Sequence, residues 1–458
     1  MRLHNTLTGT LEELRPISKE HVTIYTCGPT VYSEPHVGNW VAFIRWDLLV
    51  RTLLLEGYTT QRVMNITDVG HLTSDADEGE DKILKGAQLE GISEWDVAER
   101  YTKSFLDGMS QLNLLPPEYL TRATDHIDIQ IELVKKLEDK GYTYALSDGV
   151  YFDTARFETY ADFAHLNLDE QRAGARVAQT EGKRNPSDFV LWRLNPVGET
   201  RAMQWESPWG IGIPGWHIEC SAMAMKYLGE TIDIHTGGID HIPVHHTNEI
   251  AQSEASSEKR FANYWLHANF ITVQGTKISK SLNNGYTLSD LAKKGYSAMD
   301  FRMFILQSHY KTESNFSWEN IDAGKNRLAN WKLYACLRHQ QTDETSTLTV
   351  AEAIATINAC LQNDLSTPEA LVAAEVAMDH VRAAQDITQL VEYLDDAFGL
   401  ELASSTPDLS PDMQALLVKR SLARMGNDWQ TSDSVRDELS INGIGVNDSA
   451  SSTTWFWL

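Results

Sequence analysis

Apolar residues follow two different spacings in the first part of the chain. Short apolar runs at 22–26 and 61–66 predict buried strands, and apolar residues at helical spacing predict a helix over 41–55 between them. A strand, a helix and a strand in succession are typical of parallel sheets, because parallel neighbours need a crossover connection. The predicted fold class is therefore α/β, with ligands expected where the strands end.

Residues from about 116 to 204 interrupt this pattern, and we interpret them as an insertion. The predicted elements are a helix over 127–140, a hairpin-like pair at 142–144 and 150–152, and a polar stretch around 174–186. The α/β pattern then resumes with a helix over 217–228, a strand over 231–235 and a helix from about 245 to 253.

After about residue 318 the spacing is helical throughout, and we expect no further strands. The predicted helices cover 325–338, 349–361, 368–394 and 411–425. A run rich in Ser, Thr, Pro and Asp at 403–411 predicts a linker. These patterns divide the chain into an α/β domain over 1–320, a helical bundle over 321–402 and a small last module over 403–458.

Composition indicates a globular protein, since 42% of the 458 residues are hydrophobic and 22% are charged. No run approaches the roughly 18 apolar residues of a membrane span, and the first residues lack a basic segment followed by an apolar one, so we expect a cytoplasmic protein with no membrane partner. The net charge of -25 disfavours nonspecific binding of nucleic acid, so any RNA contact must be local. Four cysteines are too few for a disulfide scaffold, which leaves thiols available for a metal or for chemistry.

The segment between the first predicted strand and its helix is a candidate phosphate site. Gly38 allows a ligand to approach the backbone closely, and the start of a helix presents N–H groups to phosphate. His36 and Asn39 could each donate a hydrogen bond to a phosphate that gains negative charge. The alternative is a structural role for His36, as a helix cap or a packing residue.

The loop at 275–281 is a second candidate, in which Ile and Ser separate Lys277 from Lys280. Two lysines in a short loop of small polar residues can clamp a pyrophosphate. A solvated basic turn is the alternative.

A third candidate combines histidines, a carboxylate and thiols. His245 and Glu249 are four residues apart, so a helix places both on one face, as metal ligands require. Cys27 and Cys220 fall where the two halves of the sheet are expected to meet, although spacing alone leaves them as buried small residues. Histidine and a carboxylate beside thiols favour zinc over magnesium. The alternative is a polar helix face with ordinary histidines.

The first two segments, taken in this order around a split sheet, resemble the HIGH and KMSKS signatures of class I aminoacyl-tRNA synthetases. The resemblance implies that four residues stabilise the pentavalent phosphorus formed when a carboxylate attacks ATP: His36, Asn39, Lys277 and Lys280. Asn39 departs from the histidine that many members carry, and an amide donates a hydrogen bond without carrying charge.

Within that class the residues at 25–32, 214–223 and 245–250 resemble the cysteinyl-tRNA synthetases, and the likeness covers nearly the whole chain. It implies a Rossmann-like catalytic domain over 1–320 and one zinc ion held by Cys27, Cys220, His245 and Glu249. It further implies that Thr30, Trp216 and His235 contact the substrate, and that the residues binding ATP are His36, Gly38, Asn39, Gly237, Gly238, Asp240 and Lys280.

The activity implied is ATP-dependent activation of L-cysteine and its transfer to tRNA(Cys), with zinc selecting the thiolate and Mg²⁺ accompanying ATP. We expect a monomer. The module at 403–458 resembles the anticodon-binding part of the family, in which the aromatic residues at 455–457 either stack on bases or fill a small core. Two alternatives stay open: a cysteine ligase acting on an amino sugar, which the last module disfavours, and a noncatalytic RNA-binding paralogue, which His36 and Lys280 disfavour.

Overall fold

The computed structural model forms two compact units. One contains residues 2–290 and 310–314, and the other contains residue 1, residues 291–309 and residues 315–458. The residues that the structure describes are 1–70, 82–167, 182–196, 198, 200–279, 282, 284–340, 345–448 and 453–458. The predicted division into a catalytic domain, a bundle and a last module stays a prediction.

The first unit is built on a five-stranded parallel sheet with the strand order β11-β10-β3-β4-β5. Its strands are β3 (His21–Thr26), β4 (Thr59–Ile66), β5 (Tyr119–Arg122), β10 (Ile232–Gly238) and β11 (Ala262–Ala268). The predicted α/β class with a parallel sheet is therefore confirmed. Because the chain crosses from β3 to β4 on one side and from β10 to β11 on the other, the order reverses between β3 and β10, where ligands bind in such sheets.

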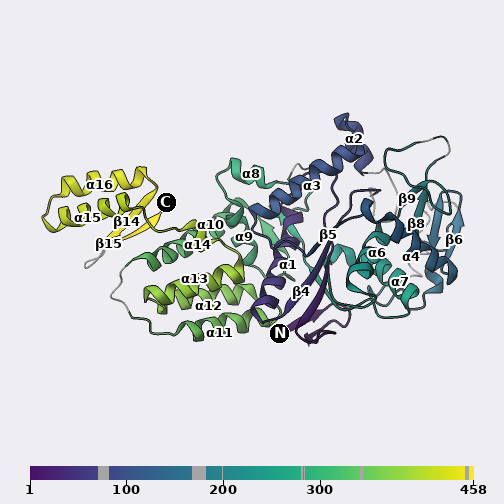
Figure 1. Cartoon of the computed structure of the whole chain (residues 1–458), viewed down its shortest axis with the longest axis horizontal. Helices are drawn as coiled ribbons and strands as arrows, with labels where there is room; N and C mark the ends of the chain where they lie inside the picture. The colour runs from purple at the N-terminus through teal and green to yellow at the C-terminus, as the bar shows by residue number, and fades with distance from the viewer. Residues whose placement is uncertain are drawn as a thin grey trace. The chain divides into compact units, whose positions relative to one another are not determined.

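Helices cover both faces of this sheet (Figure 1). The helices of this unit include α1 (Val37–Leu55), α2 (Lys82–Glu90), α3 (Glu94–Gln111), α6 (Trp216–Leu228) and α7 (Thr247–Ser257). Helix α1 packs against β4, β10 and β11, whereas α6 packs against β3 and β4 and also touches α7. The short strands β1 (Arg2–Asn5), β2 (Thr10–Glu13) and β12 (Ile271–Val273) lie in the same unit.

Residues 119–122 of the predicted insertion form β5 of the main sheet. Beyond them, helix α4 (Ile127–Asp139) packs on a four-stranded antiparallel sheet whose last strand lies past residue 204. The strands, in spatial order, are β6 (Thr143–Leu146), β7 (Gly149–Phe152), β8 (Phe189–Leu194) and β9 (Gly212–Pro214). The helix and the hairpin were predicted, but β8 and β9 were not. Phe152 and Trp192 share a core with Ile218 of α6, so this sheet buttresses the helix that carries Cys220. Part of the polar stretch around 174–186 lies outside the described residues.

The second unit is mainly helical. Its elements are α9 (Ala298–Leu306), β13 (Ser314–Phe316, which begins in the first unit), α10 (Trp318–Cys336), α11 (Val350–Gln362), α12 (Thr367–His380), α13 (Ala384–Phe398), α14 (Leu402–Ser405), α15 (Pro411–Met425) and α16 (Trp429–Ile441), with α8 (Leu288–Lys293) at the boundary. None of the helices in the described ranges combines the length and the apolar character needed to cross a membrane.

The single helix predicted over 368–394 is wrong, because the structure has two helices there. The backbone N–H groups of Arg382 and Ala383 donate to the Ser346 hydroxyl at 3.1 Å each, and the Tyr334 hydroxyl donates to the Val381 carbonyl at 2.9 Å. A distant loop and helix thus satisfy backbone groups that an uninterrupted helix would pair internally. The helical pattern alone could not show this interruption.

The expectation of no strands after residue 318 is also wrong. Strands β14 (Ile444–Asp448) and β15 (Thr453–Trp457) pair antiparallel, and the predicted linker begins with the short helix α14. Trp455 is 6% exposed and packs with Val435, Leu439 and Cys336. For this one of the three aromatic residues at 455–457, the core interpretation is confirmed.

Candidate active site

Three segments far apart in sequence meet at the carboxyl ends of β3 and β10. Cys27 directly follows β3, and its N–H donates to the Thr236 carbonyl of β10 at 3.1 Å. Cys220 comes from α6, and Glu249 from the first turn of α7. The ligand atoms of Cys27, Cys220, His245 and Glu249 lie within 4.8 Å of one another, and all four residues are buried.

The helix predicted to begin near residue 245 starts two residues later, at Thr247. His245 and His246 instead belong to a π-helical turn, Ile242–His246, that runs directly into α7. The spacing argument for His245 still holds, since its Nε2 lies 3.0 Å from Glu249 Oε1. The wider turn also brings His246 Nε2 to 3.9 Å from the same oxygen.

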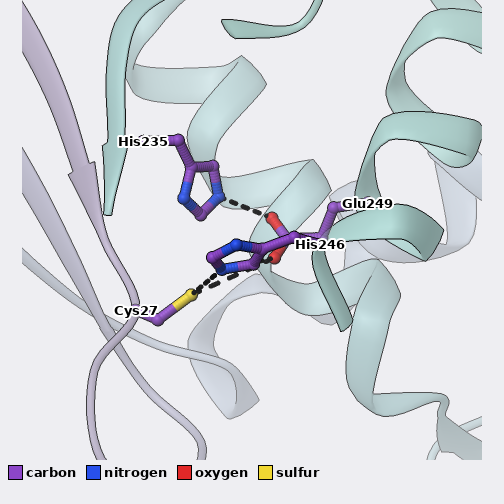
Figure 2. A group of neighbouring side chains, drawn as sticks. All are labelled: Cys27, His235, His246 and Glu249. Carbon is purple, nitrogen blue, oxygen red and sulfur yellow. Dashed lines mark hydrogen bonds and ion pairs between the residues drawn. The ribbon is translucent and has the colours of Figure 1, made fainter. Parts of the chain in front are cut away.

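His235 and His246 complete a second group of potential ligands with Cys27 and Glu249 (Figure 2). His235 Nε2 lies 2.9 Å from Glu249 Oε2, and His246 Nε2 lies 3.3 Å from Cys27 Sγ. Sequence reasoning assigned His235 to the substrate and gave His246 no role. The signal for His246 was present, because it precedes Glu249 by three residues and so shares its helix face.

The charges in this cluster are set by competition between burial and neighbours. Burial raises the pKa of Glu249, but His235 and His245 outweigh it and lower that pKa to about 2. Burial lowers the pKa of His245, yet Glu249 and Cys220 raise it to about 10. A carboxylate is thus held ionised inside the protein, which is favourable only where cationic or hydrogen-bonding partners surround it.

Each of the two thiols affects the ionisation of the other. Burial opposes ionisation of Cys220, but its hydrogen bond with Cys27 and the charge of His245 lower its pKa to about 6. Burial and the Cys220 thiolate raise the pKa of Cys27 well above its ordinary value. Two sulfurs, an imidazole and a carboxylate make a donor set that suits a borderline-soft divalent metal ion and fits poorly with magnesium, which prefers oxygen.

Further hydrogen bonds orient these histidines. His217 Nδ1 lies 2.8 Å from His245 Nδ1, which leaves His245 Nε2 facing Glu249. His246 Nδ1 lies 2.7 Å from His267 Nε2, and His267 Nδ1 lies 2.8 Å from the Thr6 hydroxyl. Such partners fix ring orientation and tautomer at metal sites. Sequence reasoning found neither His217 nor His267, because nothing in their spacing links them to the cluster.

Two residues predicted to contact the substrate or ATP, Trp216 and Gly237, lie against histidines of this cluster. Trp216 stacks on the His245 ring with centroids 4.2 Å apart, and half-buried Thr30 forms a bridge with Thr67. Gly237 is required sterically, since a Cβ there would sit 2.6 Å from His246 Cε1. Gly238 follows at the end of β10, and Asp240 is exposed beside it.

His36 and Asn39 cap helix α1. His36 Nδ1 accepts from the Gly38 N–H at 3.1 Å, and Asn39 Oδ1 accepts from the His36 N–H at 3.0 Å. The helix therefore begins at Val37, four residues before its predicted start. The structural alternative raised for His36 is thus present in the molecule, and burial lowers the pKa of His36 so that its ring is neutral near pH 7.

The second loop packs on the first. A Cβ on Gly38 would sit 2.7 Å from Ile278 Cδ1, so the glycine lets the two segments touch. Asn284 closes the loop by donating to the Lys277 carbonyl at 3.2 Å and accepting from the Ser279 N–H at 2.8 Å. Lys277 is exposed. Lys280 lies outside the described residues.

Comparison of the chain with known proteins shows the family to which it belongs. Residues 13–326 match the family described as the class I (C) tRNA synthetase catalytic domain. The chain is 40% identical to the cysteine–tRNA ligase of Treponema denticola, over 99% of both chains. It is 42% identical to cysteine–tRNA ligase 1 of Burkholderia lata, over 98% of this chain and 95% of that one. This chain belongs to the cysteine–tRNA ligase family.

Solved structures show how the fold of this cysteine–tRNA ligase family member relates to others of class I. The methionyl-tRNA synthetase of Mycobacterium tuberculosis, solved with methionyl-adenylate, superposes with a TM-score of 0.61 at 14% identity. The match covers 87% of this chain and 96% of that one. At that identity the likeness concerns the fold alone, and it agrees with the α/β architecture described above.

Proposed function

We propose that this chain activates L-cysteine with ATP, forming cysteinyl-adenylate and pyrophosphate, and then transfers the cysteinyl group to tRNA(Cys). The observation that carries the proposal is the convergence of Cys27, Cys220, His245 and Glu249 on one buried point, in a chain that matches cysteine–tRNA ligases over nearly its full length. A pocket that must choose cysteine over serine needs a ligand for sulfur, because an apolar pocket distinguishes near-isosteres weakly.

Those four side chains would hold one zinc ion. When bound, zinc supplies a Lewis acid that lowers the pKa of a coordinated thiol and prefers sulfur to a hydroxyl oxygen. His217 holds the His245 ring in place, and the Trp216 ring covers it. Trp216, Thr30 and His235 would line the pocket for the amino acid, and the buried surroundings would exclude water from it.

The cap on helix α1 leaves both of its residues able to act on phosphate. His36 Nδ1 accepts from the backbone, so the neutral ring carries its proton on Nε2, which can donate. Asn39 uses its carbonyl oxygen in the cap, so its amide NH₂ is the group that can donate to a ligand. Capping and catalysis are therefore compatible roles for the same two side chains.

We assign the other nucleotide contacts to groups beside this helix start. Gly38, Gly237 and Gly238 would let the backbone approach ATP, and Asp240 would contact the nucleotide. Lys277 and Lys280 would neutralise the pyrophosphate as it leaves, with Mg²⁺ held mainly by the phosphates. The packing of Ile278 on Gly38 supports this assignment, because it brings the loop of Lys277 beside the helix start.

We assign residues 1–320 to catalysis, 321–402 to the bundle and 403–458 to the anticodon. Such recognition uses local contacts, as the net charge of -25 requires. The relatives match along 99% of this chain and so include the last module, which disfavours an amino sugar as acceptor. The proposal takes the chain to act as a cytoplasmic monomer, which light scattering of the purified protein would test for oligomeric state.

The decisive experiment is ATP–pyrophosphate exchange by the purified chain with cysteine or with serine. We expect exchange that depends on cysteine, with serine far less effective, and about one zinc per chain by metal analysis. Aminoacylation of tRNA(Cys), compared with an amino sugar, then separates the two acceptors. Absence of exchange at saturating cysteine and zinc contradicts the proposal, and unchanged aminoacylation by Lys280→Ala contradicts the role of that lysine.

A further inference from the structure

A buried arginine on helix α1 is tied to two segments far along the chain. Arg45 is 3% exposed, and its Nη1 donates to the Asn269 carbonyl at 3.0 Å and to the Tyr310 carbonyl at 2.8 Å. Its Nη2 donates to the Ser314 hydroxyl at 2.9 Å. All four residues belong to the first unit. One guanidinium therefore joins helix α1 to both of these segments.

The same two segments are also bonded to each other. The Asn269 N–H donates to the Tyr310 carbonyl at 2.8 Å, and the Ser314 N–H donates to the Phe270 carbonyl at 3.0 Å. Phe270 directly precedes β12, and α1 packs against β12. Because Arg45 donates to both segments, it fixes where β12 begins relative to the helix.

The chemistry of the guanidinium explains why an arginine stands here. Its nitrogens donate in fixed directions within one plane, so one side chain can hold acceptors on different segments, whereas a lysine ammonium is a point charge on a flexible stem. Burial lowers the pKa of Arg45 to about 10, so the side chain is still charged near pH 7. A buried charge needs its hydrogen bonds, which confines the acceptors to one arrangement.

The loop that carries Lys277 leaves directly from this anchored strand. The Val273 N–H donates to the Thr276 carbonyl at 2.8 Å, and the Thr276 N–H donates to the Val273 carbonyl at 3.0 Å. Gln274 and Gly275 between them have φ angles of 50° and 75°, as a tight hairpin turn requires. Lys277 follows this turn at once, so a short hydrogen-bonded turn connects it to β12.

The far end of the same loop is attached to the start of helix α1. The Val37 N–H, at the first position of the helix, donates to the Tyr286 carbonyl at 2.7 Å. His36 pairs with Thr287 in an antiparallel bridge. Both ends of the loop are therefore held against α1, one beside the proposed phosphate site and the other through the buried guanidinium.

We propose that Arg45 is a positioning residue for cysteine activation, because it sets the place from which the Lys277 loop reaches the phosphates of ATP. The proposal rests on the proposed function, which gives Lys277 the leaving pyrophosphate as its partner. A displacement of about 1 Å at a reacting group can lower a rate by about 100-fold. The four residues proposed to hold zinc belong to other segments, so cysteine binding should not depend on Arg45.

The test compares Arg45→Lys with Arg51→Lys in the full chain. Arg51 is a matched control, because it lies on the same helix, is 6% exposed and donates to Asp47 Oδ2 at 2.7 Å and to the Asn113 carbonyl at 2.8 Å. We expect the kcat of ATP–pyrophosphate exchange to fall by up to about 100-fold in Arg45→Lys, with zinc content and the KM for cysteine unchanged. Arg51→Lys should retain the wild-type kcat.

Hydrogen–deuterium exchange gives a second readout that needs neither ATP nor cysteine. The Thr276 N–H is protected by its bond to the Val273 carbonyl, and the exchange rate of such an amide reports how often the local structure opens. Residues 271–279 should exchange faster in Arg45→Lys than in the wild type, whereas β3 and β4 should not change. Arg51→Lys should leave residues 271–279 as they are in the wild type.

Ser314→Ala is a milder variant that decides the question if Arg45→Lys does not fold. It removes only the hydroxyl that accepts from Arg45 Nη2. Circular dichroism establishes that each variant folds. We expect a smaller fall in kcat than in Arg45→Lys, together with faster deuterium uptake at residues 271–279.

Two outcomes overturn the proposal. One is wild-type kcat and wild-type deuterium uptake at residues 271–279 in both Arg45→Lys and Ser314→Ala. The other is an equal loss in Arg51→Lys, which would show that Arg45 only stabilises the fold. Failure of the proposed function looks different, since the wild-type chain itself would then show no ATP–pyrophosphate exchange. Faster deuterium uptake in Arg45→Lys would still support the anchoring of the loop.

Discussion

One buried carboxylate and one at the surface of this chain have lowered pKa values for different reasons. Glu249 lies among histidines and cysteines at the end of the parallel sheet, and it is completely buried. Asp448, on β14, accepts from Arg420 Nη1 at 2.9 Å and Nη2 at 2.7 Å, and from Arg424 Nη1 at 2.8 Å. Its side chain is 28% exposed, whereas that of Arg420 is 3% exposed.

The difference lies in whether the partners can give up their protons. Arginine stays charged at every physiological pH, so the Arg420–Asp448 pair is a permanent clamp between α15 and the final hairpin. Histidine and cysteine can exchange their protons for a metal ion, so the surroundings of Glu249 form a site that can be loaded. A lowered carboxylate pKa therefore indicates stability in one region and chemistry in the other.

The largest expected effect is a loss of zinc affinity when a metal-ligand side chain beside Glu249 is removed. Cys220→Ala takes away the thiolate, and zinc affinity should fall by at least about 100-fold, more than loss of an outer partner causes. Cysteine-dependent exchange should fall with it. Metal analysis after dialysis and the exchange assay measure both.

Cys360→Ala is the control for that variant, because Cys360 is half-buried on α11 and far along the chain from the cluster. It should bind zinc as the wild type does. If Cys220→Ala also retained its metal, Cys220 would not be a metal ligand, and the surroundings of Glu249 would not form the metal site described above.

Breaking the clamp should reduce stability without affecting activation. Asp448→Asn keeps the shape but leaves Arg420 buried without its counter-charge, and hydrogen bonds to charged groups contribute about 1.5–3 kcal/mol. We expect a loss of that size in the free energy of unfolding measured with urea. Cysteine-dependent exchange should persist, and a loss of exchange at unchanged stability would contradict this separation.

The same clamp predicts a dependence on pH. The hydrogen bonds from Arg420 lower the pKa of Asp448 below its value in the unfolded chain, which is about 3.9. The stabilisation by the ionised Asp448 is therefore fully present above that unfolded value, and it is lost as the pH falls through the folded value. The difference in unfolding free energy between wild type and Asp448→Asn should therefore shrink from about pH 5 downward. A constant difference down to about pH 2 would show that the charge is not responsible.

A smaller loss of zinc affinity is expected when a residue that hydrogen-bonds to a metal ligand is replaced. His217→Ala removes the hydrogen bond to His245 Nδ1, and loss of such a partner weakens metal binding by about tenfold. His217→Asn, which retains a polar group, should recover part of the affinity in a competition titration with a chelator. Equal affinity in all three proteins would mean that His217 only fills space.

The smallest change in the free energy of unfolding is expected for an exposed ion pair in the same part of the chain as the Arg420–Asp448 pair. Arg436 Nη1 lies 3.3 Å from Asp433 Oδ1, and both side chains are more than half exposed. Arg436→Ala should change the free energy of unfolding by less than about 0.5 kcal/mol, because water screens such pairs. A loss as large as that of Asp448→Asn would show that burial does not set the strength of the clamp.

The sequence predicted secondary structure correctly where the local spacing of apolar residues is compatible with one element only. Apolar runs located β3, β4 and β10, and helical spacing located α4, α6 and α15, because each element buries a face that its own residues define. It failed where distant groups intervene. Ser346 and Tyr334 divide one helical pattern into α12 and α13, and the short final strands β14 and β15 exist only as a pair over a core built by other helices.

The amino-acid sequence by itself determined which donors this chain owns, and the spacing of His245 and Glu249 placed those two on one side of a helical turn. Only the tertiary structure decided that Cys27 and Cys220 reach the same point, and that His235 and His246 lie beside Cys27 and Glu249. The physical reason is that a parallel sheet aligns the ends of strands from distant segments at one edge, whereas sequence spacing reports only neighbours within a few turns.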